Sequence, residues 1–596
     1  MLKKILHVDL SKREYNTLNL DSKVLFEYLG GLGLGVYYLY RNVTPAINPF
    51  SPLASLILLC GPLSSQSISG RRYGLFFKSP LTGIIGESYS YGLISETLSA
   101  LGYMGLIVKG YAEKPTWLLI SENGVNFNDA SGLWGVDAPS KCKEISKQVK
   151  SRNLGVLSIG PAGENLVRYA SIIVDGKYMA PRCGGGAVMG SKNLKSIAID
   201  APVIEREENS EMEKIEEQIT ESIKTAQMRK DQFALTGDLA LVDIANQIGV
   251  FPTKYWRYSY SEEYLKFNAS KIASTILEER EGCGNCPIKC RYICRDPGGK
   301  AGDKYHLTYE TVNAFGGLCG LDDSERIAKM NGLCFRLGVD PASLSNMIGF
   351  AIELVSKNKL KPVDKLEYGE LEDLMRLTEQ ICYRDQFGFY FSDGLRIAAK
   401  KINYNETLIE VKGLEPIGLD PRGLVMQPLI IGVSPSGGNY GSTSIFIEEL
   451  LNNQGKRERT PKISDIIALV DKICLVNSLM VCDILSTYIN LQQLSEILSI
   501  SLNIHYGEDT LKKVCEKIIN VSRHFLLREG LRSADDLLPE LFYEQPIVTG
   551  ASKGKVIDFD IYKKNLEEYY FRRGFSKEGV PHKKSELDDE GVTYYF

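Results

Sequence analysis

Four cysteines lie close together in this 596-residue chain, at Cys283, Cys286, Cys290 and Cys294. Two thiolates separated by two residues can bind the same metal or cluster from one tight turn. A third thiolate four residues later lies about one helical turn further on and faces the same centre. We interpret this group as ligands of an iron–sulfur cluster. A cluster of four irons needs a fourth thiolate, which Cys294 or a distant cysteine could supply.

Two other interpretations of the cysteine group remain open. One is a structural zinc knuckle closed by Cys294, although zinc ribbons usually pair two Cys-x2-Cys turns and this chain has a single one. The other is a loop of unligated cysteines. The spacing also reverses the Cys-x3-Cys-x2-Cys order of radical enzymes that use S-adenosylmethionine, which disfavours that class.

Three glycine-rich segments offer backbone N–H groups that could approach a phosphate or an extended heterocycle closely. They are residues 69–74, 160–165 and 182–193. None contains the Walker A pattern or the fingerprint of a dinucleotide-binding βαβ unit. Each alone is more often a tight turn than a cofactor loop, so the three gain weight only in combination.

The composition is that of an ordinary soluble protein, with 44% hydrophobic and 24% charged residues. A net charge of −4 gives no reason to expect nucleic acid or an anionic membrane as a partner. The first nine residues indicate a β-strand rather than a signal peptide, and the most apolar run, 53–63, is far shorter than the roughly 20 residues that span a bilayer. We therefore expect a cytoplasmic protein whose cysteines are mostly reduced.

Predicted strands dominate the first third of the chain, and predicted helices dominate the rest. Short β-favouring runs occur at 56–59, 106–108, 117–120 and 197–199. Apolar residues at helical spacing predict helices within 205–230 and at 324–337, 341–357, 370–384, 464–479, 491–502 and 509–527. We expect a multidomain α+β fold divided into residues 1–205, 206–415 and 416–596.

Many short sequences along the chain together resemble the aldehyde:ferredoxin oxidoreductase family of tungstopterin enzymes. The run from Gly184 to Ile199 is the most specific of them, and Cys-x2-Cys-Pro-Ile-x-Cys at 283–290 is another. The others lie at 61–63, 78–83, 101–115, 159–165, 309–311, 337–340, 420–423, 528–539 and 569–570. Because they cover essentially the whole chain in order, coincidence is a poor explanation.

The resemblance implies a fold and a set of cofactors. A β-rich N-terminal base would carry two pterin dithiolenes, and two mainly α-helical domains would enclose a tungsten or molybdenum atom. The resemblance also implies that a 4Fe–4S cluster is bound by Cys283, Cys286 and Cys290 with Cys482 as the fourth ligand. Cys294 then becomes a bystander.

The resemblance also assigns residues to the pterin cofactor. Arg72, or the adjacent Arg71, resembles an arginine between pterin and cluster, where a guanidinium can donate hydrogen bonds to both anionic groups. Arg182 resembles an arginine that contacts a phosphate beside the glycine-rich turn of Gly184 and Gly185.

The chain departs from the family pattern at several functional positions. Of the two pterin-binding motifs, the first loses its leading acid but keeps Asp340, and the second begins with Asn477 and has Met480 in place of glycine. Asn477 can hydrogen-bond to a pterin edge, but without charge. Tyr440 replaces a histidine thought to donate a proton near the metal, and its ordinary pKa of about 10 makes it a poorer proton shuttle. Tyr89 replaces an asparagine that binds magnesium, so magnesium is only an optional part of the expected cofactor set.

The implied activity is oxidation of a small aldehyde to a carboxylate, with electrons passing through the cluster to ferredoxin or a ferredoxin-like subunit. Glu310 resembles the active-site glutamate that would handle the proton of water or of the aldehyde hydrate, and burial should raise its pKa toward neutrality. His306 is the histidine placed to compensate for Tyr440, although a surface or core role is commoner for such a residue.

Two other functions remain open at this point. The same scaffold could perform other low-potential chemistry, such as reduction of an acid or an aromatic acyl group. It could also serve as an electron-transfer or structural subunit that keeps only the cluster. Tungsten and molybdenum are not distinguished, because the metal would sit on pterin sulfurs rather than on side chains. A homodimer is compatible with the resemblance, although no motif specifies one.

Overall fold

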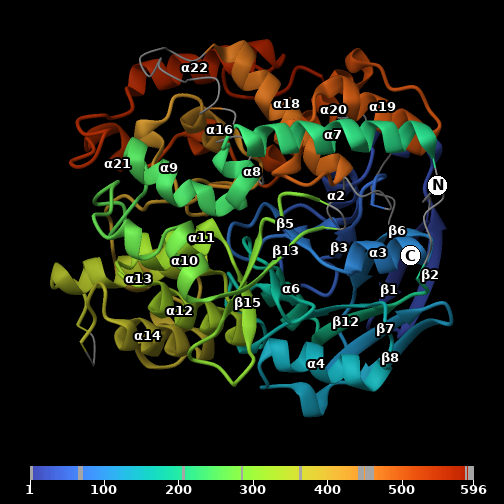
Figure 1. The fold of residues 1–596 in the computed structure, drawn as a ribbon, viewed down its shortest axis with the longest axis horizontal. Helices are drawn as coiled ribbons and strands as arrows, with labels where there is room; N and C mark the ends of the chain where they lie inside the picture. The colour runs from blue at the N-terminus through green and yellow to red at the C-terminus, as the bar shows by residue number, and fades with distance from the viewer. Residues whose placement is uncertain are drawn as a thin grey trace.

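The computed structural model describes residues 4–64, 71–203, 209–283, 286–361, 365–439, 449, 462–583 and 587. Within them, strands gather in the N-terminal third and helices make up most of the remainder (Figure 1). The expected α+β architecture, with a β-rich base followed by a mainly helical part, is therefore confirmed. No helix in this described part is long and apolar enough to cross a membrane.

The base contains two six-stranded sheets, with strand orders β2-β1-β6-β3-β4-β5 and β11-β10-β9-β12-β7-β8. The strands of the first sheet are β1 (Lys4–Asp9), β2 (Glu14–Asn19), β3 (Leu56–Leu59), β4 (Arg72–Lys78), β5 (Ile85–Tyr91) and β6 (Tyr103–Lys109). Those of the second are β7 (Thr116–Ser121), β8 (Gly124–Asp129), β9 (Leu154–Ser158), β10 (Ile172–Val174), β11 (Tyr178–Ala180) and β12 (Leu194–Asp200). The helices of the base are α1 (Ser22–Tyr28), α2 (Gly31–Asn42), α3 (Ile94–Ala100), α4 (Ala138–Val149), α5 (Pro161–Glu164) and α6 (Gly185–Gly190).

The pairing of β4 with β5 fixes which side chains share one face of the first sheet. The two strands are antiparallel, and Arg72 is paired with Tyr91. Because side chains alternate along a strand, Glu87, Tyr89 and Tyr91 project from the same face as Arg72. This face therefore places one guanidinium, one carboxyl and two phenols side by side.

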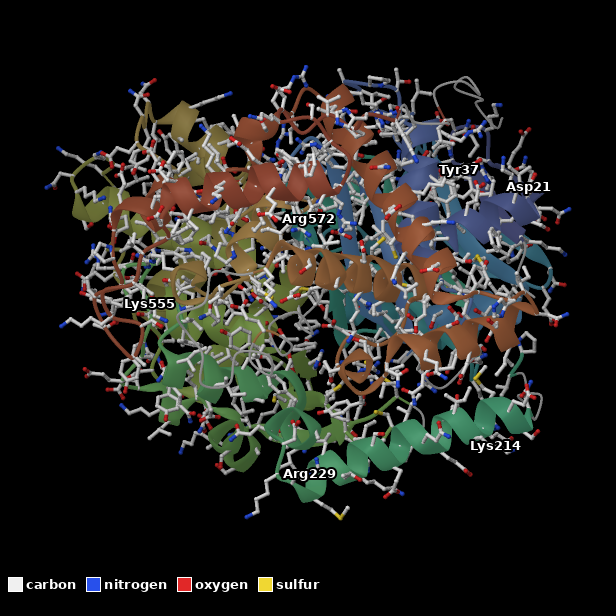
Figure 2. All side chains as sticks on the ribbon, turned by 90° about the horizontal axis from the view of Figure 1, so that it is seen from above. Asp21, Tyr37, Lys214, Arg229, Lys555 and Arg572 are labelled. Carbon is white, nitrogen blue, oxygen red and sulfur yellow. The ribbon has the colours of Figure 1, made fainter. Side chains whose placement is uncertain are left out.

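Helices form most of the chain after residue 209. They are α7 (Ser210–Met228), α8 (Gln232–Thr236), α9 (Ala240–Ile248), α10 (Ala269–Thr275), α11 (Tyr309–Val312), α12 (Ser324–Leu337), α13 (Pro341–Ser356), α14 (Leu371–Tyr383), α15 (Leu395–Lys401), α16 (Gln427–Val433), α18 (Ile463–Leu479), α19 (Leu491–Leu502), α20 (Glu508–Arg528), α21 (Glu540–Glu544) and α22 (Phe559–Arg572). Figure 2 shows α7, with Lys214 labelled on it and Arg229 labelled just beyond its C-terminal end, extending along one side of the molecule. Helices α18 and α20 pack against the buried α2 of the base.

A small third sheet frames the cysteine segment. It consists of β13 (Leu277–Glu281), β14 (Arg291–Arg295) and β15 (Lys304–Leu307), all antiparallel. Cys283, Cys286 and Cys290 lie in the connection between β13 and β14. The sheet therefore holds both ends of that connection in place.

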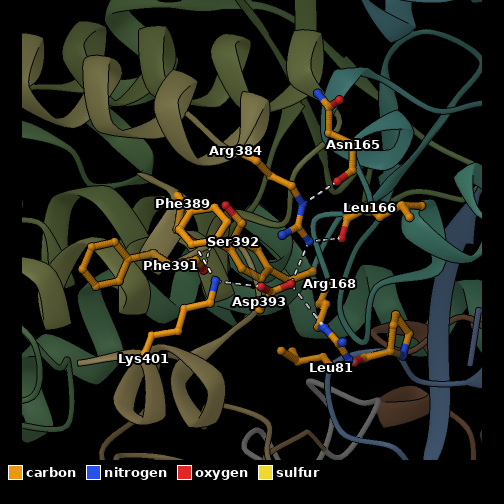
Figure 3. Close-up of polar contacts among 12 residues, drawn as sticks. Leu81, Asn165, Leu166, Arg168, Arg384, Phe389, Phe391, Ser392, Asp393 and Lys401 are labelled. Carbon is orange, nitrogen blue, oxygen red and sulfur yellow. Dashed lines mark hydrogen bonds and ion pairs between the residues drawn. The ribbon is translucent and has the colours of Figure 1, made fainter. Parts of the chain in front are cut away.

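A charged network joins the base to the helical part (Figure 3). The carboxylate of Asp393 forms ion pairs with Arg384, Lys401 and Arg168, with N···O distances of 2.7, 2.9 and 3.3 Å. Arg384 also donates to the backbone carbonyls of Asn165 and Leu166, both in the base. Burial alone would raise the pKa of Asp393, but hydrogen bonds from Arg384 and Lys401 outweigh it and hold the pKa at about 2.

Replacing Asp393 with asparagine is expected to destabilise the fold by about 2 kcal/mol at pH 7, because three cations lose their shared anion. The folded pKa lies below the unfolded value near 4, so this stabilisation is present above pH 4 and is lost as the pH falls toward 2. Thermal unfolding of both proteins should therefore show a gap at pH 7 that is about half as large at pH 3. Glu406→Gln, which removes the partner of Lys359 in an exposed ion pair, is the control and should change little. Equal losses in the two variants would contradict this role of Asp393.

Candidate active site and cluster site

A cavity of about 230 Å³ lies where the first sheet meets β15 and helices α11 to α13. Four residues predicted from the sequence line it together, Arg72, Arg182, Glu310 and Asp340, and His306 lines it as well. With Glu87 and Asp483, which also line it, the cavity brings two guanidinium groups and four carboxyl groups together from separate segments.

Glu310 lies in the first turn of α11, which Thr308 caps through its side chain. Its carboxyl accepts a hydrogen bond from the backbone N–H of Gly418 at 3.2 Å. Burial raises the pKa of Glu310 to about 7, while the guanidinium of Arg182 opposes this shift. A carboxyl group with this pKa can both accept and release a proton near neutral pH.

Arg182 belongs to the base, and its side chain contacts acidic residues of the helical part. Its Nη1 lies 3.4 Å from a carboxylate oxygen of Asp340, and its Nη2 donates to the backbone carbonyl of Glu415. Asp340 also caps α13 by accepting the backbone N–H groups of Ala342 and Ser343. Capping fixes the carboxylate, and so Asp340 holds Arg182 in a defined position.

Glu415 is a buried carboxyl that no sequence motif indicates. It accepts a hydrogen bond from the Ser343 hydroxyl at 2.8 Å, and Arg182 lies 3.9 Å away. Burial raises the pKa of Glu415 to about 7, against the opposing effect of Arg182. No sequence spacing relates Glu415 to Glu310 or Arg182, so only the fold reveals this second carboxyl with a pKa of about 7.

Gly184 and Gly185 do not line the cavity. Gly184 has φ = +86°, and a Cβ there would meet the carbonyl oxygen of Arg168 at 2.0 Å. A Cβ at Gly185 would meet the ring of Phe77 at 3.0 Å. Close packing of the chain against itself explains why both positions are glycine, and their contact with a cofactor remains a prediction.

Arg72 links the cavity to the segment that carries Cys482. Its Nη1 donates to the backbone carbonyl of Val481 at 3.0 Å, and its guanidinium lies 4.4 Å from the ring centre of Tyr89. The hydroxyl of Tyr89 donates to Glu87 at 2.6 Å. The position of the expected magnesium-binding asparagine is therefore a phenol that binds a carboxyl group, and magnesium remains only a prediction.

The cysteine segment and Cys482 lie next to each other. The pKa of the Cys482 thiol is raised to about 12, mainly by burial and then by the neighbouring thiols of Cys283 and Cys286. Burial likewise raises the pKa of Cys290, and Cys482 and Cys283 add to the effect. A Cβ at Gly237, which has φ = +65°, would meet the Cβ of Cys290 at 2.4 Å, so glycine is needed for this close approach. Four thiols thus converge from two distant parts of the chain.

Cys294 lies in a different environment. It is buried on β14 in a core cluster that contains Leu307 and Phe315, and burial and Glu278 raise its pKa. In the described part of the chain, no three His, Cys, Asp or Glu side chains converge as they would around a single metal ion. Cys294 packs in one core cluster, whereas Cys286, Cys290 and Cys482 pack together in another, and the choice between an iron–sulfur cluster and a zinc knuckle remains a prediction.

Asn477 lies near the C-terminal end of α18 and lines a second cavity of about 80 Å³, which adjoins the first because Glu87 lines both. Asn477 is buried, and its amide oxygen has no hydrogen-bond partner among the described residues. Nε of Arg182 and Oε1 of Glu415 likewise have no partner among the described residues. Such orphaned polar atoms fit a polar cofactor such as a pterin. Tyr440, the predicted replacement for the family histidine, lies outside the described residues.

His306 is half-buried, lines the cavity and meets Tyr178 edge to face, with ring centres 5.9 Å apart. Burial lowers the pKa of its imidazole to about 3, and Arg291 and Lys177 assist. The ring is therefore neutral near pH 7. It can hydrogen-bond to a bound molecule, but it cannot replace a cationic proton donor.

The fold, the converging thiols and the acid-lined cavity are those of an oxidoreductase. Two family profiles cover almost the whole chain: "Aldehyde ferredoxin oxidoreductase, N-terminal domain" matches residues 5–201, and "domains 2 & 3" of the same family matches residues 214–588. The chain belongs to the aldehyde ferredoxin oxidoreductase family. Membership in this family implies a tungstopterin and a 4Fe–4S cluster.

Individual relatives agree over their full length. The tungsten-containing aldehyde ferredoxin oxidoreductase of Pyrococcus furiosus is 31% identical, with 100% of this chain and 99% of the relative covered. An "Aliphatic sulfonate oxidoreductase, WOR-like subunit" of the same organism is 26% identical over 99% of this chain and 96% of the relative. The BamBC active-site complex of benzoyl coenzyme A reductase has the same fold, with a TM-score of 0.82, 23% identity, and 100% of this chain and 97% of that one covered.

Proposed function

We propose that this protein oxidises an aldehyde to a carboxylate at a tungsten or molybdenum bis-pterin centre and passes electrons through a 4Fe–4S cluster to ferredoxin. The observation that carries the proposal is the arrangement around Arg72, which lines the cavity of Glu310 and also contacts the backbone next to Cys482. One side chain thus connects a space for chemistry with a site for electron transfer.

Arg182, Asp340 and Asn477 would hold the pterin. Nε of Arg182 could donate to a phosphate oxygen, and the amide of Asn477 could bond to a pterin edge without adding charge. Asp340 would keep Arg182 in place. When bound, the metal–pterin group would supply oxygen-atom transfer and uptake of two electrons.

Glu310 would act as the general base. Conversion of an aldehyde and water to a carboxylic acid releases two protons and two electrons, and a carboxylate with a pKa of about 7 can accept one of the protons. The second proton would leave through other groups of the cavity.

The direct test is turnover of a panel of small aldehydes under anaerobic conditions with purified ferredoxin. The expected result is formation of the corresponding acid with two ferredoxins reduced per acid, because ferredoxin accepts single electrons. A metal-loaded protein that oxidises no aldehyde but reduces an aromatic acyl thioester would overturn the assignment of aldehyde oxidation.

Reduction of an acid or an aromatic acyl group is the second candidate. The sequence has Tyr440 where the family has a histidine. In the cavity, His306 supplies a neutral imidazole and Glu310 supplies a carboxyl group with a pKa of about 7. Glu415, nearby, is a second carboxyl with a pKa of about 7. Protonated carboxyl groups suit a reaction that consumes protons. The structural neighbour was solved in complex with 1,5-dienoyl-CoA, which shows that this fold can serve such chemistry in another protein.

A further inference from the structure

Arg291 is a buried residue at the start of β14, immediately after Cys290, and only 3% of its surface is exposed. Its Nη2 donates a hydrogen bond to Sγ of Cys283 at 2.6 Å. Its guanidinium carbon lies 4.7 Å from the ring centre of Tyr91 and 5.0 Å from that of Tyr178. The cation is therefore fixed between two phenol rings with one N–H group aimed at a sulfur atom.

The surroundings of Arg291 keep its orientation constant. The hydroxyl of Tyr178 donates to the carboxylate of Glu281, and Lys177 pairs with the same carboxylate. Tyr178 is thus held from its far end while its ring covers the guanidinium. A planar guanidinium can stack on a ring and donate hydrogen bonds in its plane at the same time, whereas an ammonium group cannot.

Two arginines thereby approach the four thiols from different segments. Arg72 contacts the carbonyl of Val481, next to Cys482, and Arg291 contacts the sulfur of Cys283. Tyr91 lies between them, because it is paired with Arg72 across β4 and β5 and its ring faces Arg291. Arg291 thus bonds directly to the sulfur atom of a predicted ligand.

We propose that Arg291 is a positioning residue that raises the reduction potential of the cluster through its hydrogen bond to Cys283. Reduction adds one electron to the cluster and neither forms nor breaks a bond. The added negative charge is spread over the sulfur atoms, so a buried cation and an N–H donor at a ligand sulfur stabilise the reduced state more than the oxidised state. This inference rests on the proposed function, since it takes Cys283 as a cluster ligand.

The test is a redox titration of the full-length holoprotein followed by electron paramagnetic resonance of the reduced cluster. Arg291→Gln should shift the reduction equilibrium at least tenfold toward the oxidised cluster, which corresponds to a midpoint about 59 mV lower for one electron. Arg280→Gln is the matched control. Arg280 anchors the same segment through the carbonyls of Ile288 and Lys289 and stacks on Tyr292, and within the described part of the chain its hydrogen bonds do not reach a sulfur atom. Its removal should leave the midpoint unchanged.

Arg291→Lys keeps the charge but loses the planar fork, so a smaller shift in the same direction is expected. This variant decides the question if Arg291→Gln fails to retain iron. An iron-loaded Arg291→Gln protein with the wild-type midpoint potential would overturn the inference. If Arg291→Gln loses its iron, a wild-type midpoint potential in Arg291→Lys would overturn it instead. A wild-type protein without any cluster would instead overturn the proposed function on which the inference rests.

Discussion

Replacing Cys482 with serine is expected to remove most of the protein-bound iron, from about four atoms per chain to less than one. The four thiols of Cys283, Cys286, Cys290 and Cys482 lie close enough to shift one another's pKa. A serine hydroxyl is a poor ligand for iron in such a cluster, because soft thiolates are preferred there. Iron and acid-labile sulfide should be measured on anaerobically purified protein.

Cys294→Ser is the matched control for this experiment. Cys294 is also buried and lies only four residues beyond Cys290, but it packs in another core cluster. Its replacement should leave the iron content unchanged. The opposite pattern, with iron lost from Cys294→Ser and retained in Cys482→Ser, would mean that Cys294 and not Cys482 is the fourth ligand.

Replacing Glu310 with glutamine is expected to lower kcat by about 10²- to 10³-fold at unchanged iron and tungsten or molybdenum content, because the general base is lost. The wild-type kcat/KM should rise with pH up to about 7, since only the ionised carboxylate accepts a proton and burial raises the pKa of Glu310 to that value. In the Glu310→Gln variant this rising part of the pH profile, the acid limb, should disappear. Steady-state kinetics between pH 5 and 9 would measure both effects.

Two further variants separate Glu310 from its neighbours. Asp243→Asn is the control, because burial also raises the pKa of the Asp243 carboxyl. Asp243 lies on α9 and accepts a hydrogen bond from Asn268, so the activity of this variant should stay near that of the wild type. His306→Asn should retain the limb near pH 7, because the imidazole, with a pKa of about 3, is neutral throughout this range. Loss of the limb in His306→Asn, or its survival in Glu310→Gln, would refute the role of Glu310.

Much of the helical part could be predicted from the sequence, because its local signals agree with its tertiary packing. α12 and α19 begin and end at the predicted residues, with Asp323 and Asn490 as N-caps and left-handed residues at both C-caps. In α7 the four apolar residues at helical spacing, Met212 to Ile223, are the buried ones. Strong periodicity and caps together determine such helices.

The β-sheet around the cysteine segment could not be predicted in this way. β13 is a charged sequence, Leu277–Glu281, that carries no strand pattern of its own and forms a strand because β14 pairs with it. The third sheet therefore lies within a region that was expected to be mostly helical. The division of the chain into three domains remains a proposal.

The candidate site was only partly accessible from the sequence. Glu310, Arg182 and Asp340 were identified through the family resemblance, and the structure places all three at one cavity. Glu415 and Arg291 were missed because their importance arises from contacts across long stretches of chain. Arg291 stands next to Cys290, yet adjacency in sequence does not show which sulfur a side chain will reach.

Elemental analysis of anaerobically purified protein for tungsten, molybdenum, iron and zinc, normalised per chain, tests the central claim most directly. The predicted result is about four iron atoms together with about one tungsten or molybdenum atom per chain. About one zinc atom, with neither iron nor tungsten or molybdenum, would mean that the cysteine group is structural and would contradict the proposed redox function.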